Sequence, residues 1–322
     1  MNRLKIALLS FLSLFLVAYL VFYLTKPKNK DPLKTELVTS DIDNFWLAFD
    51  KSKPEFSPSI FQETYIDKGS KGINNFMNYR IRNAEYFSTI LKRYPKYYTS
   101  IRTSTEHIQA MKEIILVNLV EFKKIYPNAV FPPVYFVVGV LNTGGTSFRN
   151  GLIVGAEMYA LTPESPIDEL SDWQRAVLKP VDGIPSLIVH ELVHFQQNNS
   201  LMSLVKTRNL LSASIDEGAA DFIAELISGK HLNSHVHDFA NPLEEELWNE
   251  FKERMIGNDY SGWLNSIQQG RPSDLGYWMG YKIIESYYAN ASDKIEAIDE
   301  IINIRDYSKF LQESRYSDKF SR

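Results

Sequence analysis

Two histidines and a glutamate interrupt an apolar run, IPSLIVHELVHFQ at residues 184–196. On a helix, His190 and His194 are four residues apart and project from one face, about 40° from each other. A helix that is apolar on all sides is buried, and burying His or Glu is unfavourable unless something satisfies it. A divalent cation does so, and His-Glu-x-x-His on a helix typically binds zinc. The alternative is a pair of core histidines with ordinary hydrogen bonds.

A third ligand is needed, because a catalytic zinc usually has three protein ligands. In IDEGAADFIAEL, residues 215–226, three acidic residues fall at i, i+4 and i+8 of one helix face, where like charges repel unless a cation is near. We expect Glu217 to be the third ligand and Asp221 to accept the second ring N–H of a ligating histidine. Gly218 leaves room for another helix to approach closely. A solvated acidic face is the alternative, and Glu225 is expected to be a surface residue.

Composition narrows the possible chemistry. The 322 residues include six histidines and no cysteine, so any metal must be held by His, Asp, Glu or Asn. The absence of cysteine also excludes disulfide scaffolds and thiol nucleophiles. A formal net charge of −4 gives no reason to expect nucleic acid as a partner. The remaining histidines are expected on polar surfaces or loops: His107, His231, His235 and His237.

The elements that must position these side chains are mostly helices. Helical patterns fill the chain to about residue 126, and short β-branched runs at 134–141 and 151–158 predict two neighbouring strands joined by a Gly-Gly turn in NTGGTSFRN. Everything after residue 185 reads as helical. The order predicts an α+β fold with a small sheet near its middle.

The N-terminus predicts a membrane attachment. Residues 6–24 carry no charge, and their length fits a membrane span better than the shorter apolar region of a signal peptide. We therefore expect a transmembrane signal-anchor at residues 1–24, a linker at 25–36, and a single-pass protein of the cell membrane; a long cleaved signal peptide is the alternative. The short basic start favours an exported body, periplasmic if the source is bacterial, whereas the lysines after the span favour the opposite orientation.

The motifs HELVH at 190–194 and EGAAD at 217–221 together resemble the gluzincin metallopeptidases, which share HExxH and a glutamate on a downstream helix. More closely, the chain resembles bacterial predicted zinc-dependent proteases related to the gliding-motility lipoprotein B family. The supporting segments are residues 131–145, 151–159 and 274–288. One departure is plain, since lipoprotein relatives need a cysteine at their processing site and this chain has none.

The resemblance implies a zincin-like body over residues 37–322. Its N-terminal lobe, 37–200, would carry the sheet and the HExxH helix, and a helical C-terminal lobe, 201–322, would close an active-site cleft. Gluzincins commonly use a Tyr or His to donate to the oxyanion, so Tyr277 and Tyr281 are candidates, with packing as the alternative. The strand lining the cleft would pair with an extended peptide, or would be merely a core strand; its residues are Gly151, Leu152, Ile153, Val154, Gly155 and Ala156.

The sequence therefore predicts a membrane-anchored zinc metallopeptidase acting on peptides or proteins. Zn²⁺ bound by His190, His194 and Glu217 would polarise the scissile carbonyl, and Glu191 would move a proton from water to the leaving amine. The alternative is a catalytically silent zincin-fold membrane protein in which zinc is structural and the function is assembly or motility. Glu191 favours the enzyme, because a structural site needs no general base.

Overall fold

The computed structural model describes residues 27–197, 208–264 and 270–320. The transmembrane segment predicted at residues 1–24 lies outside the described residues. Within the described ranges, no helix has both the length and the apolar character needed to cross a membrane. The described chain is α+β and mostly helical with one small sheet, which confirms the fold class expected from the sequence.

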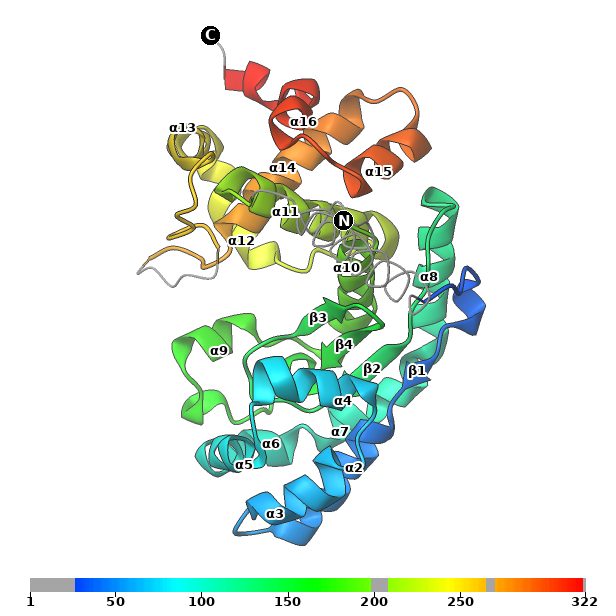
Figure 1. Ribbon diagram of the computed structural model, residues 1–322. Helices are drawn as coiled ribbons and strands as arrows, with labels where there is room; N and C mark the ends of the chain where they lie inside the picture. Colours follow the sequence, from blue (N-terminus) through cyan, green and yellow to red (C-terminus); the bar gives the residue numbers. More distant parts are fainter. Residues whose placement is uncertain (1–26, 198–207, 265–269, 321–322) are drawn as a thin grey trace, which may run out of the picture.

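Figure 1 shows two groups of elements on either side of helix α10 (Ile184–Gln197). The first group comprises the sheet and the helices that precede α10 in the chain. Two of its segments are π-helical, η2 (Gln62–Ile66) and η3 (Met77–Ile81). The α-helices of this group are α2 (Ser40–Ser52), α3 (Pro58–Phe61), α4 (Lys71–Phe76), α5 (Ala84–Arg93), α6 (Pro95–Ser100), α7 (Arg102–His107), α8 (Lys112–Ile125) and α9 (Asp172–Val177).

The sheet has four strands in the order β1-β2-β4-β3. β2 pairs in parallel with β1 and with β4, whereas β3 pairs antiparallel with β4. β2 and β4 are buried throughout, as their β-branched and aromatic residues predict. The segment expected to be only a turn contains β3, which forms one edge of the sheet. The bounds are β1 (Leu37–Val38), β2 (Val134–Val137), β3 (Gly145–Phe148) and β4 (Gly151–Gly155).

The residues predicted to form a linker are, from residue 27 onward, packed against the body. The backbone N–H of Phe131 donates to the carbonyl of Asn29 at 2.8 Å, and that of Val134 donates to Glu36 at 2.8 Å. A 3-10 turn at Pro32–Lys34 lies between these two contacts. The described part of the segment predicted as a linker is therefore hydrogen-bonded to the body at both Asn29 and Glu36.

Buried polar groups hold the loop that runs from β2 towards the site. The carboxylate of Glu157 accepts backbone N–H groups of Gly139 at 2.7 Å and Leu141 at 3.2 Å. Burial raises the pKa of this carboxyl to about 7, against the opposing effect of these hydrogen bonds. Tyr65 and Val138 bond reciprocally through the phenol oxygen, at 2.8 and 2.9 Å. This loop is therefore fixed before it enters β3.

Within the described residues, the second group consists of helices and the turns that join them (Figure 1). A capping box at Asn209 begins α11, and Gly229, with φ +69°, ends it. Helices α11 and α14 approach each other closely, as Gly218 predicted: a Cβ at Gly280 would lie 1.7 Å from the carbonyl oxygen of Ser214. The bounds are α11 (Leu210–Ser228), α12 (Ser234–Ala240), α13 (Glu244–Arg254), α14 (Leu275–Asn290), α15 (Lys294–Ile302) and α16 (Tyr307–Ser314).

Candidate metal centre

Helices α10 and α11 bring the three predicted ligands together. The Nε2 atoms of His190 and His194 are 3.1 Å apart. The Oε2 atom of Glu217 lies 3.0 Å from Nε2 of His194 and 3.6 Å from Nε2 of His190. Tetrahedral zinc with bonds of about 2.0–2.1 Å requires ligand atoms about 3.3 Å apart. The three side chains, hereafter the candidate metal cluster, therefore have the spacing and donor types that a zinc ion needs.

The second ring nitrogen of each histidine has its own acceptor. Nδ1 of His190 lies 2.8 Å from Oδ1 of Asp221, the position expected from the sequence. Nδ1 of His194 lies 3.0 Å from Oε1 of Gln197, a contact that was not expected from the sequence. When Nδ1 donates to an oxygen, the lone pair of the neutral ring is on Nε2 and faces the common point. The outer partners thus fix both rings in the orientation a metal requires.

A further chain of hydrogen bonds fixes Asp221. Nδ2 of Asn233 donates to Oδ2 of Asp221 at 2.7 Å, and Nζ of Lys179 donates to Oδ1 of Asn233 at 3.0 Å. Burial lowers the pKa of Lys179, while the carboxylates nearby oppose that shift. Neither residue carries a sequence signal, because both lie in irregular segments that only the fold brings to α11.

The carboxylates in and beside the candidate metal cluster favour a positive charge at this site. Burial alone lowers the pKa of His190, but the carboxylates of Asp221 and Glu217 outweigh it and raise that pKa to about 10. Burial likewise raises the pKa of Glu217, yet the two histidines hold it well below its usual range. Negative groups in this buried site must be balanced either by protons on the imidazoles or by a bound cation.

Glu191 lies beside the cluster in a cleft of about 400 Å³. The lining of the cleft also includes His190, Asp221 and Gly145 at the start of β3. A Cβ at Gly145 would lie 2.6 Å from Oε1 of Glu191, so only glycine lets the strand pass so close to this carboxylate. Burial raises the pKa of Glu191 and outweighs the histidines and Arg80, which lower it. The carboxyl is thus positioned, and tuned, to accept a proton.

The two candidate tyrosines lie in different places. Tyr277 lines the cleft, and its ring stacks on that of His190 with centroids 6.2 Å apart and an interplanar angle of 10°. Burial, followed by the charge of Glu217, keeps the pKa of Tyr277 well above its usual value. Tyr281 is one turn further along α14 and donates to Oε2 of Glu225 at 2.6 Å. Tyr281 is not among the residues that line this cleft, so Tyr277 is the better placed of the two candidate oxyanion donors.

The strand predicted to bind substrate is enclosed within the sheet. Residues 151–156 are buried, and β4 pairs with β2 on one side and with β3 on the other. A peptide cannot add to a strand whose two edges already have partners, which corrects the prediction for Gly151 to Ala156. The alternative, a core strand, describes β4, and the outer edge beside the cleft belongs to β3.

Three of the remaining histidines are exposed as expected: His107, His231 and His235, the last of which also lines the cleft. His237 differs from the expectation, since it is only 8% exposed. Nδ1 of His231 lies 2.9 Å from Oε2 of Glu225. Glu225 is therefore not a free surface carboxylate; it accepts from both His231 and Tyr281. The sequence missed this second cluster because its members are not spaced as neighbours on one helix.

These features define a mostly helical α+β protein in which an HExxH helix and the next helix form a three-residue candidate metal cluster. The chain matches the family model described as "Gliding motility protein GldB" over residues 28–318, and it therefore belongs to this family. The match includes the whole sheet and every helix of the candidate site. It confirms the relation to the gliding-motility lipoprotein family expected from the sequence. No curated protein and no solved structure matches the chain.

Proposed function

We propose that this protein is a zinc-dependent metallopeptidase of the gluzincin type, with a zincin-like fold. One observation carries the proposal: the metal-binding atoms of His190, His194 and Glu217 converge within 4.8 Å of one another beside a cleft that contains Glu191. The donor set of two imidazoles and one carboxylate is that of catalytic zinc sites, which keep a fourth position open. A closed structural site would have four protein ligands.

The chain's own residues have distinct tasks in peptide-bond hydrolysis. A zinc ion held by His190, His194 and Glu217 would supply an activated nucleophile at neutral pH and would polarise the carbonyl group. Glu191 accepts the proton of the attacking water and delivers it to the leaving amine, for which its raised pKa is suited. Tyr277 lines the cleft with a phenol that stays protonated, so it is the candidate donor to the developing oxyanion.

The edge of β3 is the proposed docking site for an extended substrate. Gly155 donates its N–H to the carbonyl of Gly144 at 2.9 Å, so these two residues form a hydrogen-bonded pair. In an antiparallel ladder, hydrogen-bonded pairs alternate with pairs that are not hydrogen-bonded to each other. By this alternation Gly145 and Ser147 turn their N–H and C=O groups away from β4. A peptide added there forms backbone hydrogen bonds and places its scissile bond next to Glu191, which Gly145 approaches most closely.

Membrane association belongs to the same proposal. The label of the matching family model marks a lipoprotein family, and residues 6–24 of this chain are uncharged and apolar. We propose attachment through this N-terminal segment, with the body on the extracytoplasmic side. An alternative function is a silent zincin-fold protein in which zinc stabilises the fold and the protein serves motility. The family description favours that alternative, whereas Glu191 in an open cleft favours the enzyme.

The test is Glu191→Gln in the zinc-loaded full chain, assayed with a broad library of peptides. Cleavage should fall by about 10²–10⁴-fold, the usual effect of losing a general base, while one zinc per chain remains. The matched control is Glu225→Gln, which changes a glutamate on α11 outside the candidate metal cluster and should leave cleavage intact. Unchanged turnover in Glu191→Gln would contradict the proposed mechanism. Bound zinc without cleavage by the unmodified chain would favour the structural alternative.

A further inference from the structure

A second hollow, of about 910 Å³, lies next to the metal-site cleft. Its walls are α4 and the π-helical turn η3 on one side and the end of β3 with the following turn on the other. We call it the cationic groove. Its lining comprises Lys71, Asn74, Asn75, Phe76, Asn78, Tyr79, Arg80, Thr146, Ser147, Phe148, Arg149 and Asn150.

The lining of the cationic groove has one sign of charge. Lys71, Arg80 and Arg149 contribute three positive charges, and no acidic residue is among the described residues that line the groove. Among the described residues, neither Lys71 nor Arg80 forms a salt bridge. The chain as a whole is acidic, with a formal charge of −4. A concave surface of opposite sign to the whole protein concentrates anionic ligands.

The groove and the cleft share one strand. Gly145 lines the cleft beside Glu191, and the next residues, from Thr146 to Asn150, line the cationic groove. An extended peptide rises about 3.3 Å per residue, the same as the strand it pairs with. A peptide lying on β3 with its reacting bond opposite Gly145 therefore enters the groove after about one to three residues.

The other groups of the groove also suit a peptide. Four asparagine side chains can donate to and accept from peptide groups, and Tyr79 exposes 77% of its surface. Phe148 packs on Tyr135 with ring centroids 6.0 Å apart, which forms an aromatic floor next to the edge strand. Polar, aromatic and cationic groups thus meet beside the proposed substrate strand.

We propose that the cationic groove binds acidic side chains of the extended substrate, on one side of the scissile bond, and so selects peptides with Asp or Glu there. This inference rests on the proposed function. Arg80 is common to both sites, because its charge also acts on Glu191. Lys71 and Arg149 line the groove but not the metal-site cleft, so they are the residues to change.

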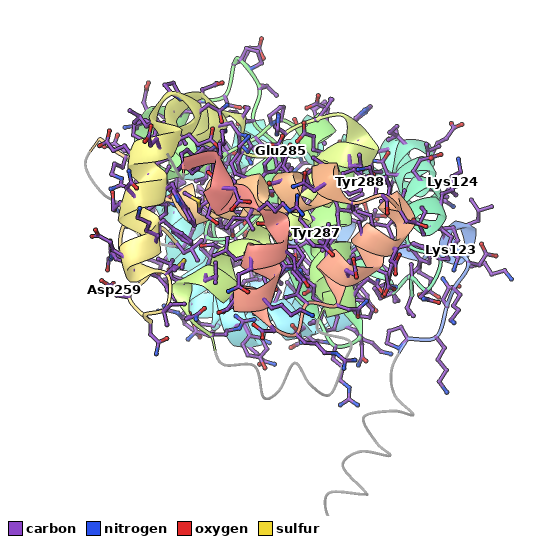
Figure 2. All side chains as sticks on the ribbon, turned by 90° about the horizontal axis from the view of Figure 1, so that it is seen from above. Lys123, Lys124, Asp259, Glu285, Tyr287 and Tyr288 are labelled. Carbon is purple, nitrogen blue, oxygen red and sulfur yellow. The ribbon has the colours of Figure 1, made fainter. Side chains whose placement is uncertain are left out.

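Binding is measured separately from cleavage, with the zinc-loaded full chain carrying Glu191→Gln. The probes are two fluorescent ten-residue peptides that differ only in three consecutive residues, Glu in one and Gln in the other. The Glu peptide should bind about tenfold more tightly at low salt, as expected for a few partly exposed charge pairs. Adding Lys71→Glu and Arg149→Glu should abolish this preference. The matched control is Lys123→Glu with Lys124→Glu at the end of α8 (Figure 2), which should keep it.

The binding outcomes test this inference, and the cleavage outcomes test the proposed function. Equal binding of the two peptides would overturn the inference, as would a preference that survives the groove variant. The neutral pair Lys71→Gln with Arg149→Gln provides the same comparison if charge reversal impairs folding, which thermal unfolding detects. A Glu preference that disappears in the groove variant supports the inference. If the unmodified chain then cleaves neither peptide, only the proposed activity has failed.

Discussion

Helix α11 contributes to two clusters of histidine and carboxylate side chains, but only one of them has the geometry of a metal site. Glu217 joins the candidate metal cluster, and Glu225, two turns later, joins a second cluster with His231, His237 and Tyr281. In the first, three donor atoms converge within 4.8 Å. In the second, Oε2 of Glu225 is taken by Tyr281 at 2.6 Å and by His231 at 2.9 Å.

The difference lies in where the imidazole nitrogens point. In the candidate metal cluster, Asp221 and Gln197 hold the Nδ1 atoms, so both Nε2 atoms face Glu217. In the second cluster the rings of His231 and His237 pack against each other with centroids 4.4 Å apart. Ligand residues alone therefore do not make a site; outer hydrogen bonds that orient the rings are also needed.

The pKa values of the histidines also distinguish the two clusters. Carboxylates outweigh burial at His190 and raise its pKa to about 10. At His237, burial and then the neighbouring His231 lower the pKa to about 4. The first cluster thus favours a cation, whereas the second favours a neutral imidazole. This contrast can be tested by changing one glutamate of each cluster.

The largest effect is expected from Glu217→Gln compared with Glu225→Gln. The first variant loses an anionic ligand of the candidate metal cluster, so zinc content after dialysis should fall to near zero and cleavage with it. The second leaves the three ligands in place and should retain one zinc per chain. Metal analysis by plasma mass spectrometry measures both. Equal zinc loss in the two variants would show that the contrast between the clusters is wrong.

A smaller effect concerns pH. Because the pKa of His237 is about 4 in the folded chain and ordinarily 6.5, the unfolded chain takes up this proton first as pH falls. Stability from this group is therefore complete above pH 6.5 and decreases from there towards pH 4. In His237→Gln the melting temperature should fall less steeply over that range. His107→Gln, at an exposed position, is the control. Parallel pH curves for His237→Gln and the unmodified chain would contradict this assignment.

The sequence predicted the parts of the site that helix periodicity fixes. His190 and His194 share a face because they are four residues apart, and the same spacing places Asp221 one turn after Glu217. The buried, glycine-mediated approach of α14 to α11 was also foreseeable from Gly218, since no side chain separates the helices there. These are local consequences of residue type and spacing.

The sequence could not predict what depends on tertiary arrangement. Tyr277 and Tyr281 are equivalent by spacing, and only the placement of α14 puts one in the cleft and the other beside Glu225. β3 was not predicted because it lies in a Gly-rich segment with a turn signal; its strand geometry comes from pairing with β4. Asn233 and Lys179 reach Asp221 from irregular segments, which carry no periodic signal.

The central claim is that zinc binds at the candidate metal cluster. The most direct test is anomalous X-ray diffraction at the zinc absorption edge from crystals of the zinc-loaded full chain. We expect one strong peak about 2.0–2.2 Å from Nε2 of His190, Nε2 of His194 and a carboxylate oxygen of Glu217. A peak at His231 and His237 instead, or none at this cluster, would contradict the claim.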